Sequence, residues 1–486
     1  MTVPTFEFPM IDRFIDRVDE LARLESWWND DDALPINLFG RRRVGKSWLF
    51  RRFAHGKPAI LLVAHKVAPG AQLATFARAL EAILGVVPEL PDLASLFSTL
   101  YRIARDERVL VVIDEFPWLL PSGEQATDRA LTAVQAVIEH ERDRSQLRLI
   151  LCGSAIKQME AMQTERNPLF GRFAPLHLRP LAFAEASLFL TELDPISRFE
   201  RFAITGGMPR YLTTLGADRS LRSALAHQVL NHNAALWDEA RTVLEQELGE
   251  PRLHFAILES LATGDKELNE IAQSTRVPAT SLSKYLNVLS DLGIVDRRLP
   301  IGARPNARGG HWHLLDPFFR FWFRFVFPYQ DELENGLSGN DLFDAIISEQ
   351  LHDHVAGEFE RWCQRWTRTH RGTKSPTVGS WWGAATKHGH TSAGRHTEEI
   401  DIVGIRQGRR VSIVGEAKWR TRKLDATILR DLYEYKLPAL EAAGFTLDRD
   451  LEVLLFARAG YSASLRAAAD RDQRVTLVDV AAALAH

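Results

Sequence analysis

The chain has 486 residues, which is too long for one hydrophobic core, so its length predicts three or four domains. Its composition, 45% hydrophobic and 25% charged, is that of a soluble globular protein and excludes disordered, collagen-like and disulfide-scaffold classes. The formal net charge of -3 gives no overall attraction to nucleic acid, so any such binding surface must be a local patch.

Cysteine content and apolar runs bear on where the protein works. Only Cys152 and Cys363 are present, which excludes a disulfide framework and a cysteine-rich zinc site. Residues 1–14 lack the basic start and long apolar core of a signal peptide. The most apolar later run contains Arg320 and Arg324 and cannot span a bilayer. We therefore expect a cytoplasmic protein without a membrane partner.

Short apolar, β-rich runs alternate with amphipathic stretches in the first part of the chain. The runs cover residues 36–39, 59–63, 109–113 and 149–151. Strands that alternate with helical patterns predict βαβ units and a parallel sheet. The predicted fold class is therefore α/β.

A phosphate-binding pattern, G-x-x-x-x-G-K-[ST], separates the first of these strands from a helix expected over residues 48–54. Its members are Gly40, Arg41, Arg42, Arg43, Val44, Gly45, Lys46 and Ser47. Glycines let the backbone wrap phosphates, while successive N–H groups and the helix N-terminus supply positive potential. We expect Lys46 to reach the β- and γ-phosphates and the Ser47 hydroxyl to hold Mg²⁺.

The strand over residues 109–113 runs into Asp114 and Glu115, the pattern of a Walker B strand. Both carboxylates should lie at the C-terminal edge of the sheet, beside the phosphates. We expect Asp114 to complete the Mg²⁺ shell and Glu115 to polarise the attacking water. The next strand ends at Ser154, which is interpreted either as a sensor of the γ-phosphate or as a helix N-cap. These residues predict hydrolysis of ATP or GTP without specifying the base.

A winged helix–turn–helix is predicted after a helical region that extends to about residue 248. Three helical stretches over residues 253–294 precede two β-like pieces, at 295–299 and 311–315. The second helix of the motif turns Leu282, Leu286 and Leu289 to the core. Its outward side chains are Thr280, Ser281, Ser283, Lys284 and Asn287.

This motif carries a local basic patch. Between residues 276 and 310, six cations oppose two carboxylates, a net charge of +4. Such a patch suits the phosphates of duplex DNA, and we expect the wing residues Arg304 and Arg308 to contact them. The alternative is a winged helix that contacts a protein partner or packs between domains.

The polar segment over residues 331–340 is expected to be a loop and the last domain boundary. An α/β region follows, in which residues 399–418 predict a β-hairpin. Period-2 alternation places Glu416 and Lys418 on one face of its second strand, and Asp401 on one face of the first. Mg²⁺ prefers oxygen ligands and polarises a scissile phosphate, while a lysine orients or activates water.

Several short boxes resemble those of the archaeal-type ATPases of the STAND/AAA+ group. They lie at residues 14–21 (FIDRVDEL), 168–172 (PLFGR), 205–212 (TGGMPRYL), 285–286, 316–318 and 321–322, so their order spans nearly the whole chain. The resemblance implies ATP as the nucleotide, with Arg17 near the adenine. It also implies that Pro209 packs on the adenine from a helical lid and that Arg172 stabilises phosphate charge.

The family resemblance extends to a C-terminal restriction-endonuclease-like domain, and the hairpin itself resembles the PD-(D/E)XK nucleases. That likeness implies Asp401 and Glu416 as metal ligands, Lys418 as a catalytic residue and Glu360 as the glutamate of the preceding helix. A basic track suited to a phosphate backbone follows Glu360. Its members are Arg361, Arg365, Arg368, Arg371 and Lys374. A domain that binds nucleic acid without cleaving it is the alternative.

These interpretations divide the chain into a P-loop ATPase core (1–178), a helical lid (179–248), a winged helix–turn–helix (249–330) and a PD-(D/E)XK nuclease-like domain (341–486). We expect an ATP- and Mg²⁺-dependent switch in which the nucleotide closes the lid on the core, while the winged helix holds duplex DNA. The rival hypothesis is a regulatory or scaffold switch, with a protein or a second copy as its partner and an inactive nuclease-like domain.

Overall fold

The computed structural model of the protein describes residues 2–248, 251–305, 307, 309–386 and 397–485. The chain forms two compact units, Met1–Leu181 with Met208–Arg210, and Ala182–Gly207 with Tyr211–His486. The division into four domains stays a prediction. No helix in the described ranges is long and apolar enough to cross a membrane.

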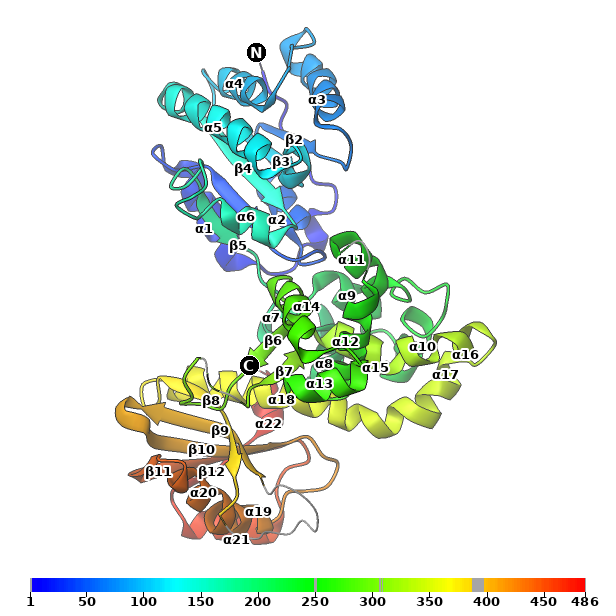
Figure 1. Ribbon diagram of the computed structural model, residues 1–486, viewed down its shortest axis with the longest axis vertical. Coiled ribbons are helices and arrows are strands. Elements are labelled where there is room, and N and C mark those ends of the chain that lie inside the picture. Colours follow the sequence, from blue (N-terminus) through cyan, green and yellow to red (C-terminus); the bar gives the residue numbers. More distant parts are fainter. Residues whose placement is uncertain (1, 249–250, 306, 308, 387–396, 486) are drawn as a thin grey trace. The chain divides into compact units, whose positions relative to one another are not determined.

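A five-stranded parallel sheet forms the centre of the first unit, in the order β2-β3-β4-β1-β5 (Figure 1). Its strands are β1 (Ile36–Phe39), β2 (Ala59–Val63), β3 (Val109–Asp114), β4 (Leu147–Gly153) and β5 (Ala174–His177). The sequence predicted the first four. It missed β5, a short edge strand whose proline and half-polar composition hide its β character.

Helices cover both faces of this sheet. They are α1 (Val18–Asn29), α2 (Lys46–Ala54), α3 (Pro69–Leu84), α4 (Leu93–Ile103), α5 (Glu124–Glu141) and α6 (Ile156–Ala161). Alternate residues of β3, Val109, Val111 and Ile113, pack in one cluster with apolar side chains of α3, α4 and α5. Because β3 is buried on both faces, all six of its residues are buried, which explains the unbroken apolar run over residues 109–113 before Asp114.

The second unit begins with helices and a two-stranded hairpin. The helices are α7 (Phe183–Ser187), α8 (Pro195–Thr205), α9 (Pro209–Leu215), α10 (Leu221–Gln228), α11 (Glu239–Leu248), α12 (Arg252–Ala262), α13 (Leu268–Thr275), α14 (Ala279–Asp291) and α15 (Pro317–Phe325). The first two residues of α9 belong to the first unit. Strands β6 (Val295–Arg298) and β7 (His311–Leu314) pair antiparallel after α14. The helix–turn–helix with its wing is therefore α13, α14 and this hairpin.

The expectation of a loop over residues 331–340 was wrong in part. Helix α16 (Gln330–Glu334) enters this segment and α17 (Gly339–Leu342) begins within it. Ser338 caps α17 by accepting a hydrogen bond from the Asp341 N–H. Leu333 and Leu342 are buried, so two apolar anchors in a polar stretch are enough to fold these short helices.

A mixed five-stranded sheet forms the C-terminal part, in the order β12-β11-β10-β9-β8. Its strands are β8 (Thr377–Ala384), β9 (Thr397–Arg406), β10 (Arg410–Lys418), β11 (Thr446–Ala457) and β12 (Val475–Val478). One face is covered by α18 (Ser348–Arg371) and the other by α19 (Thr427–Asp431), α20 (Leu437–Ala442) and α21 (Ala463–Arg471), before the terminal α22 (Val480–Ala485) (Figure 1). The predicted hairpin is β9 and β10, which turn at Gly408 with a positive φ of 71°.

The loop between β6 and β7 packs on this C-terminal sheet. Ile301 is 8% exposed, belongs to the C-terminal core and donates its N–H to the Ser380 carbonyl at 2.9 Å. His311 stacks on Trp382 of β8 with ring centroids 4.9 Å apart. The wing is thus engaged by the C-terminal domain, with Arg304 exposed to solvent.

Candidate functional site

The phosphate-binding loop joins β1 to α2, and its two glycines are required by geometry. A β-carbon on Gly40 would lie 2.2 Å from the carbonyl oxygen of Leu178, a distance that no side chain allows. Gly45 caps α2 with a positive φ of 101°. Between them Val44 is buried, while Arg41, Arg42 and Arg43 remain half-buried or exposed along the loop.

The groups expected to bind phosphate and magnesium converge beside this loop. Lys46 is buried and donates to the carbonyls of Gly40 at 2.7 Å and Arg41 at 3.1 Å. The Ser47 hydroxyl donates to Asp114 Oδ2 at 3.1 Å. The parallel strands β1 and β3, which flank β4 in the sheet, thus bring a hydroxyl and a carboxylate from residues 67 positions apart into contact.

Glu115 lies just past the end of β3 in the left-handed region, with φ 53°. Its Oε2 accepts hydrogen bonds from the Ser154 hydroxyl at 2.9 Å and the Ser154 N–H at 3.2 Å. Ser154 follows β4, the strand between β1 and β3 in the sheet. The structure therefore brings Ser154 to the carboxylate expected to act on water, a contact that the sequence did not predict.

The residues implied by the family resemblance lie in different surroundings. Arg17 is buried and donates to the carbonyls of Val44 at 3.0 Å and Arg179 at 2.8 Å. Its bond to Val44 fixes the backbone of the phosphate-binding loop. Pro209 Cγ lies 3.6 Å from the position that a Gly45 β-carbon would occupy, and its packing on the adenine stays a prediction. Arg172 instead pairs with Glu139 of α5 at 3.1 Å, and its role at the phosphate stays a prediction.

In the winged helix, α14 buries and exposes the same side chains that its sequence pattern predicted. Its buried residues are Leu282, Leu286 and Leu289, and its exposed ones include Thr280, Ser281, Ser283, Lys284 and Asn287. Two cations of the basic patch have partners within the protein, because Arg298 pairs with Asp265 at 3.3 Å and Arg297 donates to the Ala307 carbonyl at 2.6 Å. Arg308 lies outside the described residues.

The C-terminal carboxylates and lysine form one buried cluster. Lys418 Nζ lies 2.6 Å from Asp401 Oδ2 and 2.8 Å from Glu416 Oε2. Asp401 Oδ2 also accepts the Ala417 N–H at 2.8 Å, and Glu416 is fully buried. The Lys418 ammonium group is thus the ion-pair partner of Glu416 Oε2, and no further hydrogen-bond donor reaches this buried oxygen from the described residues.

Charge and burial set the protonation of this cluster. Burial alone would lower the pKa of Lys418, but Glu416 and Asp401 outweigh it and raise that pKa. Burial, followed by the Asp401 charge, raises the pKa of Glu416 and brings that of Glu360 to about 8. The charge of Asp401 on β9 thus acts on the carboxyl group of Glu360 on α18. A lysine with a raised pKa stays protonated, so Lys418 is suited to hold a phosphate oxygen and not to take a proton from water.

Several cations of the predicted basic track at residues 361–374 have partners within the protein, while Arg365 and Arg368 are exposed, so the track stays a prediction. Arg361 is paired with the buried carboxylate of Glu358 at 3.1 Å, and Arg371 with Glu452 at 3.0 Å. Lys374 donates to the Asp450 carbonyl at 2.9 Å. These pairs also commit Glu358 to arginines, so it is not free to replace Glu360 at the site.

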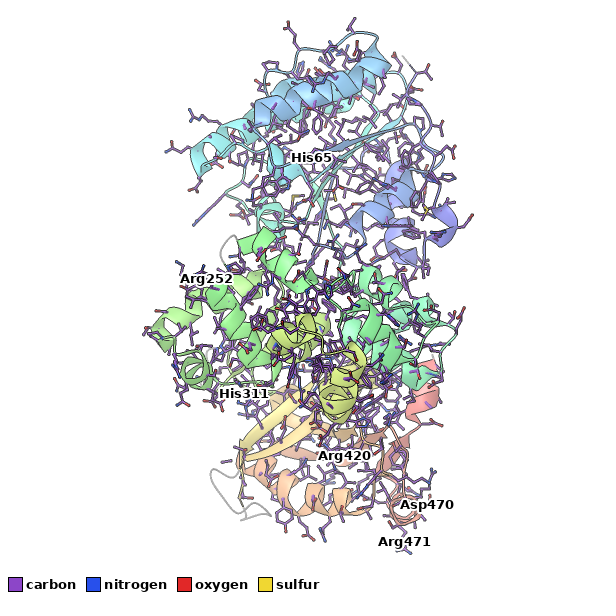
Figure 2. All side chains as sticks on the ribbon, turned by 90° about the vertical axis from the view of Figure 1, so that its right-hand side faces the viewer. His65, Arg252, His311, Arg420, Asp470 and Arg471 are labelled. Atoms are coloured by element: carbon purple, nitrogen blue, oxygen red, sulfur yellow. The ribbon has the colours of Figure 1, made fainter. Side chains whose placement is uncertain are left out.

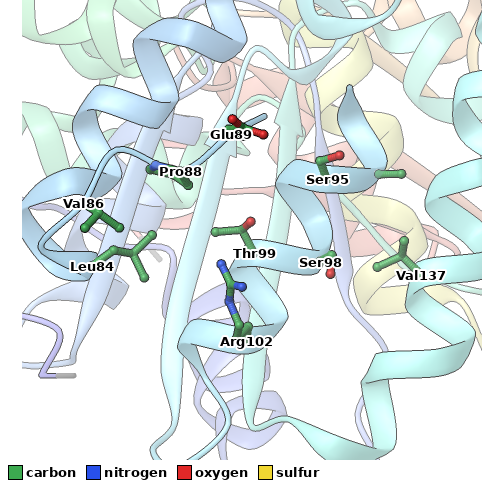
Figure 3. A pocket seen from close by; sticks show the side chains of 10 residues that line it. Leu84, Val86, Pro88, Glu89, Ser95, Ser98, Thr99, Arg102 and Val137 are labelled. Carbon is green, nitrogen blue, oxygen red and sulfur yellow. The ribbon is translucent and has the colours of Figure 1, made fainter. Parts of the chain in front are cut away.

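Sequence reasoning missed Lys436 of the segment Leu432–Lys436, whose Nζ donates to Glu416 Oε1 at 2.6 Å. It also missed a hollow on the first unit (Figure 3). This hollow is lined by side chains of α4, of α5 and of the segment after α3, namely Leu84, Val86, Pro88, Glu89, Ala94, Ser95, Ser98, Thr99, Arg102 and Val137. It contains none of the P-loop or Walker B residues, and no ligand chemistry follows from its lining.

Known families match three successive parts of the chain. Residues 14–215 match an ATPase domain predominantly from Archaea. The chain belongs to the archaeal-type ATPases. Residues 254–299 of this archaeal-type ATPase match an IclR helix-turn-helix domain, and residues 322–429 match a family described as Archaea bacterial proteins of unknown function. The predicted family, the P-loop fold and the ATPase assignment are therefore confirmed.

Two proteins of Methanocaldococcus jannaschii are similar to this archaeal-type ATPase. An uncharacterized protein is 25% identical over 427 residues, which are 86% of this chain and 91% of that protein. An uncharacterized ATP-binding protein is 48% identical over 44 residues, 9% of this chain and 75% of that protein.

Solved structures also align with the chain. The Walker-type ATPase of Pyrococcus abyssi has a TM-score of 0.48 and 18% identity over 66% of this chain and 99% of that one. The ORC2 protein of Aeropyrum pernix has a TM-score of 0.45 and 16% identity over 71% of this chain and 100% of that one.

Proposed function

We propose that this archaeal-type ATPase is an ATP-driven switch that holds duplex DNA on its winged helix and cuts a nucleic-acid phosphodiester in its C-terminal domain. The observation that carries the cleavage assignment is the cluster of Asp401, Glu416 and Lys418. Two acidic side chains and a protonated lysine, gathered in a buried cluster, match the needs of a reaction that binds a metal and a phosphate together.

In the ATPase core, the side chains divide the work between binding and hydrolysis. Lys46, buried beneath the loop, would exchange its two carbonyl partners for phosphate oxygens of ATP. Glu115 would polarise the attacking water, and Ser154 would keep its carboxylate in place through the two hydrogen bonds it donates.

Both sites fit Mg²⁺ by the chemistry of their donors. In the ATPase core, the Ser47 hydroxyl and the Asp114 carboxylate would hold the ion. In the C-terminal domain, the Asp401 carboxylate and Glu416 Oε2, which both contact Lys418, would hold it. No group of three or more His, Cys, Asp or Glu that could hold a metal occurs in the described ranges, and Mg²⁺ commonly takes only one or two carboxylates beside phosphate and water. When bound, Mg²⁺ supplies polarisation of a phosphate oxygen.

The test of cleavage incubates the full chain with single- and double-stranded DNA and RNA, varying ATP and metal independently. We expect cleavage with Mg²⁺ or Mn²⁺ and little with Ca²⁺, whose coordination is larger and looser. Asp401→Asn should abolish cleavage and leave ATP hydrolysis unchanged. The matched control is Asp470→Ala, at an exposed carboxylate of α21 in the same domain (Figure 2), and it should cleave normally. If no nucleic acid is cut under any condition, the cleavage half of the proposal is rejected.

The DNA assignment rests on the exposed face of α14 and on the helix-turn-helix match. Arg304→Ala should weaken duplex binding about equally across sequences and reduce the salt slope by about 1, because a wing arginine contacts phosphate and not base edges. Arg449→Ala, at another exposed arginine, serves as control. Fluorescence anisotropy over a range of salt concentrations measures both quantities.

One observation favours a second candidate, a regulatory switch whose winged helix makes protein contacts. The wing residue Ile301 is already buried in the C-terminal core, and His311 stacks on Trp382. A wing that links domains has less surface for DNA. Unchanged duplex affinity in Arg304→Ala, together with no cleavage by the wild type, would establish this candidate in place of the first.

A further inference from the structure

The C-terminal cluster contains a second lysine beside Asp401, Glu416 and Lys418. Lys436 Nζ donates to Glu416 Oε1 at 2.6 Å, while Lys418 Nζ lies 2.8 Å from Oε2 of the same carboxylate. Glu416 is fully buried, and the side chains of Lys436 and Lys418 are 17% and 21% exposed. Each oxygen of Glu416 therefore faces a different ammonium group.

The chain places Lys436 there by an irregular turn of helix. Leu432–Lys436 forms a π-helical turn between α19 and α20, and Pro438 follows two residues later. Proline has no N–H to donate, so the regular α-helical bond at this position is absent. Leu432 and Leu437 are buried in the C-terminal core, which fixes the turn against the sheet. Turns of this kind recur at functional sites because they redirect a side chain.

We infer that Lys436 is a positioning residue of the C-terminal site, whose ammonium group fixes Glu416 and balances the charge of the two carboxylates. The inference rests on the proposed cleavage function. Two carboxylates, Asp401 and Glu416, face two ammonium groups, so the formal charges of these four side chains cancel without a metal. Lys436 holds Oε1, while Oε2 is paired with Lys418, the same ammonium group that contacts Asp401. A neutral cluster attracts a free divalent cation weakly, and it gains affinity when a phosphodiester adds negative charge.

This role predicts two effects of opposite sign in Lys436→Met. Loss of one positive charge should tighten Mn²⁺ binding, measured without nucleic acid, by at least about threefold. Loss of the hydrogen bond that fixes Glu416 should slow single-turnover cleavage at saturating Mn²⁺ by about 10- to 100-fold, the usual cost of removing a group that orients a metal ligand. Lys436→Arg keeps the charge, so its Mn²⁺ affinity should stay near that of the wild type. A merely structural role would weaken binding and cleavage together.

The experiment titrates nucleotide-free protein with Mn²⁺ and follows the free ion by electron paramagnetic resonance. Asp401→Asn identifies the part of the signal that belongs to the C-terminal site. Lys423→Met, at an exposed lysine in the loop before α19, is the control and should match the wild type. Tighter Mn²⁺ binding in Lys436→Met with slower cleavage supports the inference. Binding that is unchanged or weaker, or no Mn²⁺ binding at the C-terminal site of either protein, overturns it. If the wild type cleaves nothing, the proposed function fails, and the Mn²⁺ titration alone still decides the role of Lys436.

Discussion

Replacing Ser154 by alanine tests how the ATPase core controls its catalytic carboxylate. The Ser154 hydroxyl donates to Glu115 Oε2 at 2.9 Å, and Ser154 is only 6% exposed, so bulk water does not readily take its place. A hydrogen bond to a charged group contributes about 1.5–3 kcal/mol. The backbone N–H of Ser154, 3.2 Å from the same oxygen, remains in the variant, so the carboxylate loses one of its two donors.

We expect Ser154→Ala to lower kcat by about 10- to 150-fold, since each 1.4 kcal/mol corresponds to a factor of about ten. The KM for ATP should change little, because Ser154 acts through Glu115 on water and not on the bound nucleotide. A coupled assay of phosphate release over a range of ATP concentrations measures both constants. Ser98→Ala, on α4 and outside the P-loop, is the control and should behave as the wild type.

Three results would refute this reasoning. Wild-type kcat in Ser154→Ala would show that the bond to Glu115 does not matter for hydrolysis. A higher kcat would show that the bond holds the carboxylate away from its working position, which reverses the sign of the argument. A rise in KM alone would return Ser154 to the role of a γ-phosphate contact.

The remaining predictions concern the nucleotide site and the response to acid. Lys46→Ala should abolish ATP binding, whereas Glu115→Gln should bind ATP normally and stop hydrolysis. Of these two residues, only Lys46 contacts phosphate in the ground state. Calorimetric titration measures ATP binding, and phosphate release measures hydrolysis. Burial, followed by the charges of Arg298, Arg361 and Arg320, lowers the pKa of His313 to about 2. Below about pH 6.5 this imidazole therefore binds a proton in the unfolded chain but stays neutral in the folded chain. Stability should therefore fall as the pH drops from about 6.5, and thermal unfolding of His313→Leu should show a smaller fall than wild type over pH 7 to 4.

Local patterns predicted the nucleotide site well, because its parts are strand, loop and helix in immediate succession. Residues 36–54 contain a buried strand, two glycines at required backbone geometries and the helix that starts at Lys46. The Walker B strand, β3, is buried on both faces and so appears as an unbroken apolar run. The partnership of Glu115 with Ser154 was not predictable in this way, since it depends on which strand lies next to β3 in the sheet.

The C-terminal domain was predicted less completely for the same reason. Its hairpin, β9 and β10, was evident from alternation and a turn glycine, but β8, β11 and β12 were not predicted individually. Strand β11 has charged residues at four of its first seven positions, Asp448, Arg449, Asp450 and Glu452, so it lacks an apolar signature there. Its parallel pairing with β10 brings together segments separated by a helical excursion, and no periodicity within one segment encodes that contact.

Charge runs were the least reliable signal, and the reason also explains why Lys436 escaped notice. A run of cations along α18 looked like a binding track, yet Arg371 is neutralised by Glu452, which lies 81 residues away in sequence. Lys436 looked like an ordinary helix lysine, yet it meets Glu416, 20 residues earlier, in a buried cluster. In both cases the sequence shows a charge but not the carboxylate that the fold brings to it. Removing the counter-ion of a buried carboxylate leaves an uncompensated buried charge, which strongly destabilises the protein. Burial of the partner therefore decides how much a charged side chain contributes. The full burial of Glu416 is therefore what distinguishes Lys436 from an exposed lysine such as Lys423.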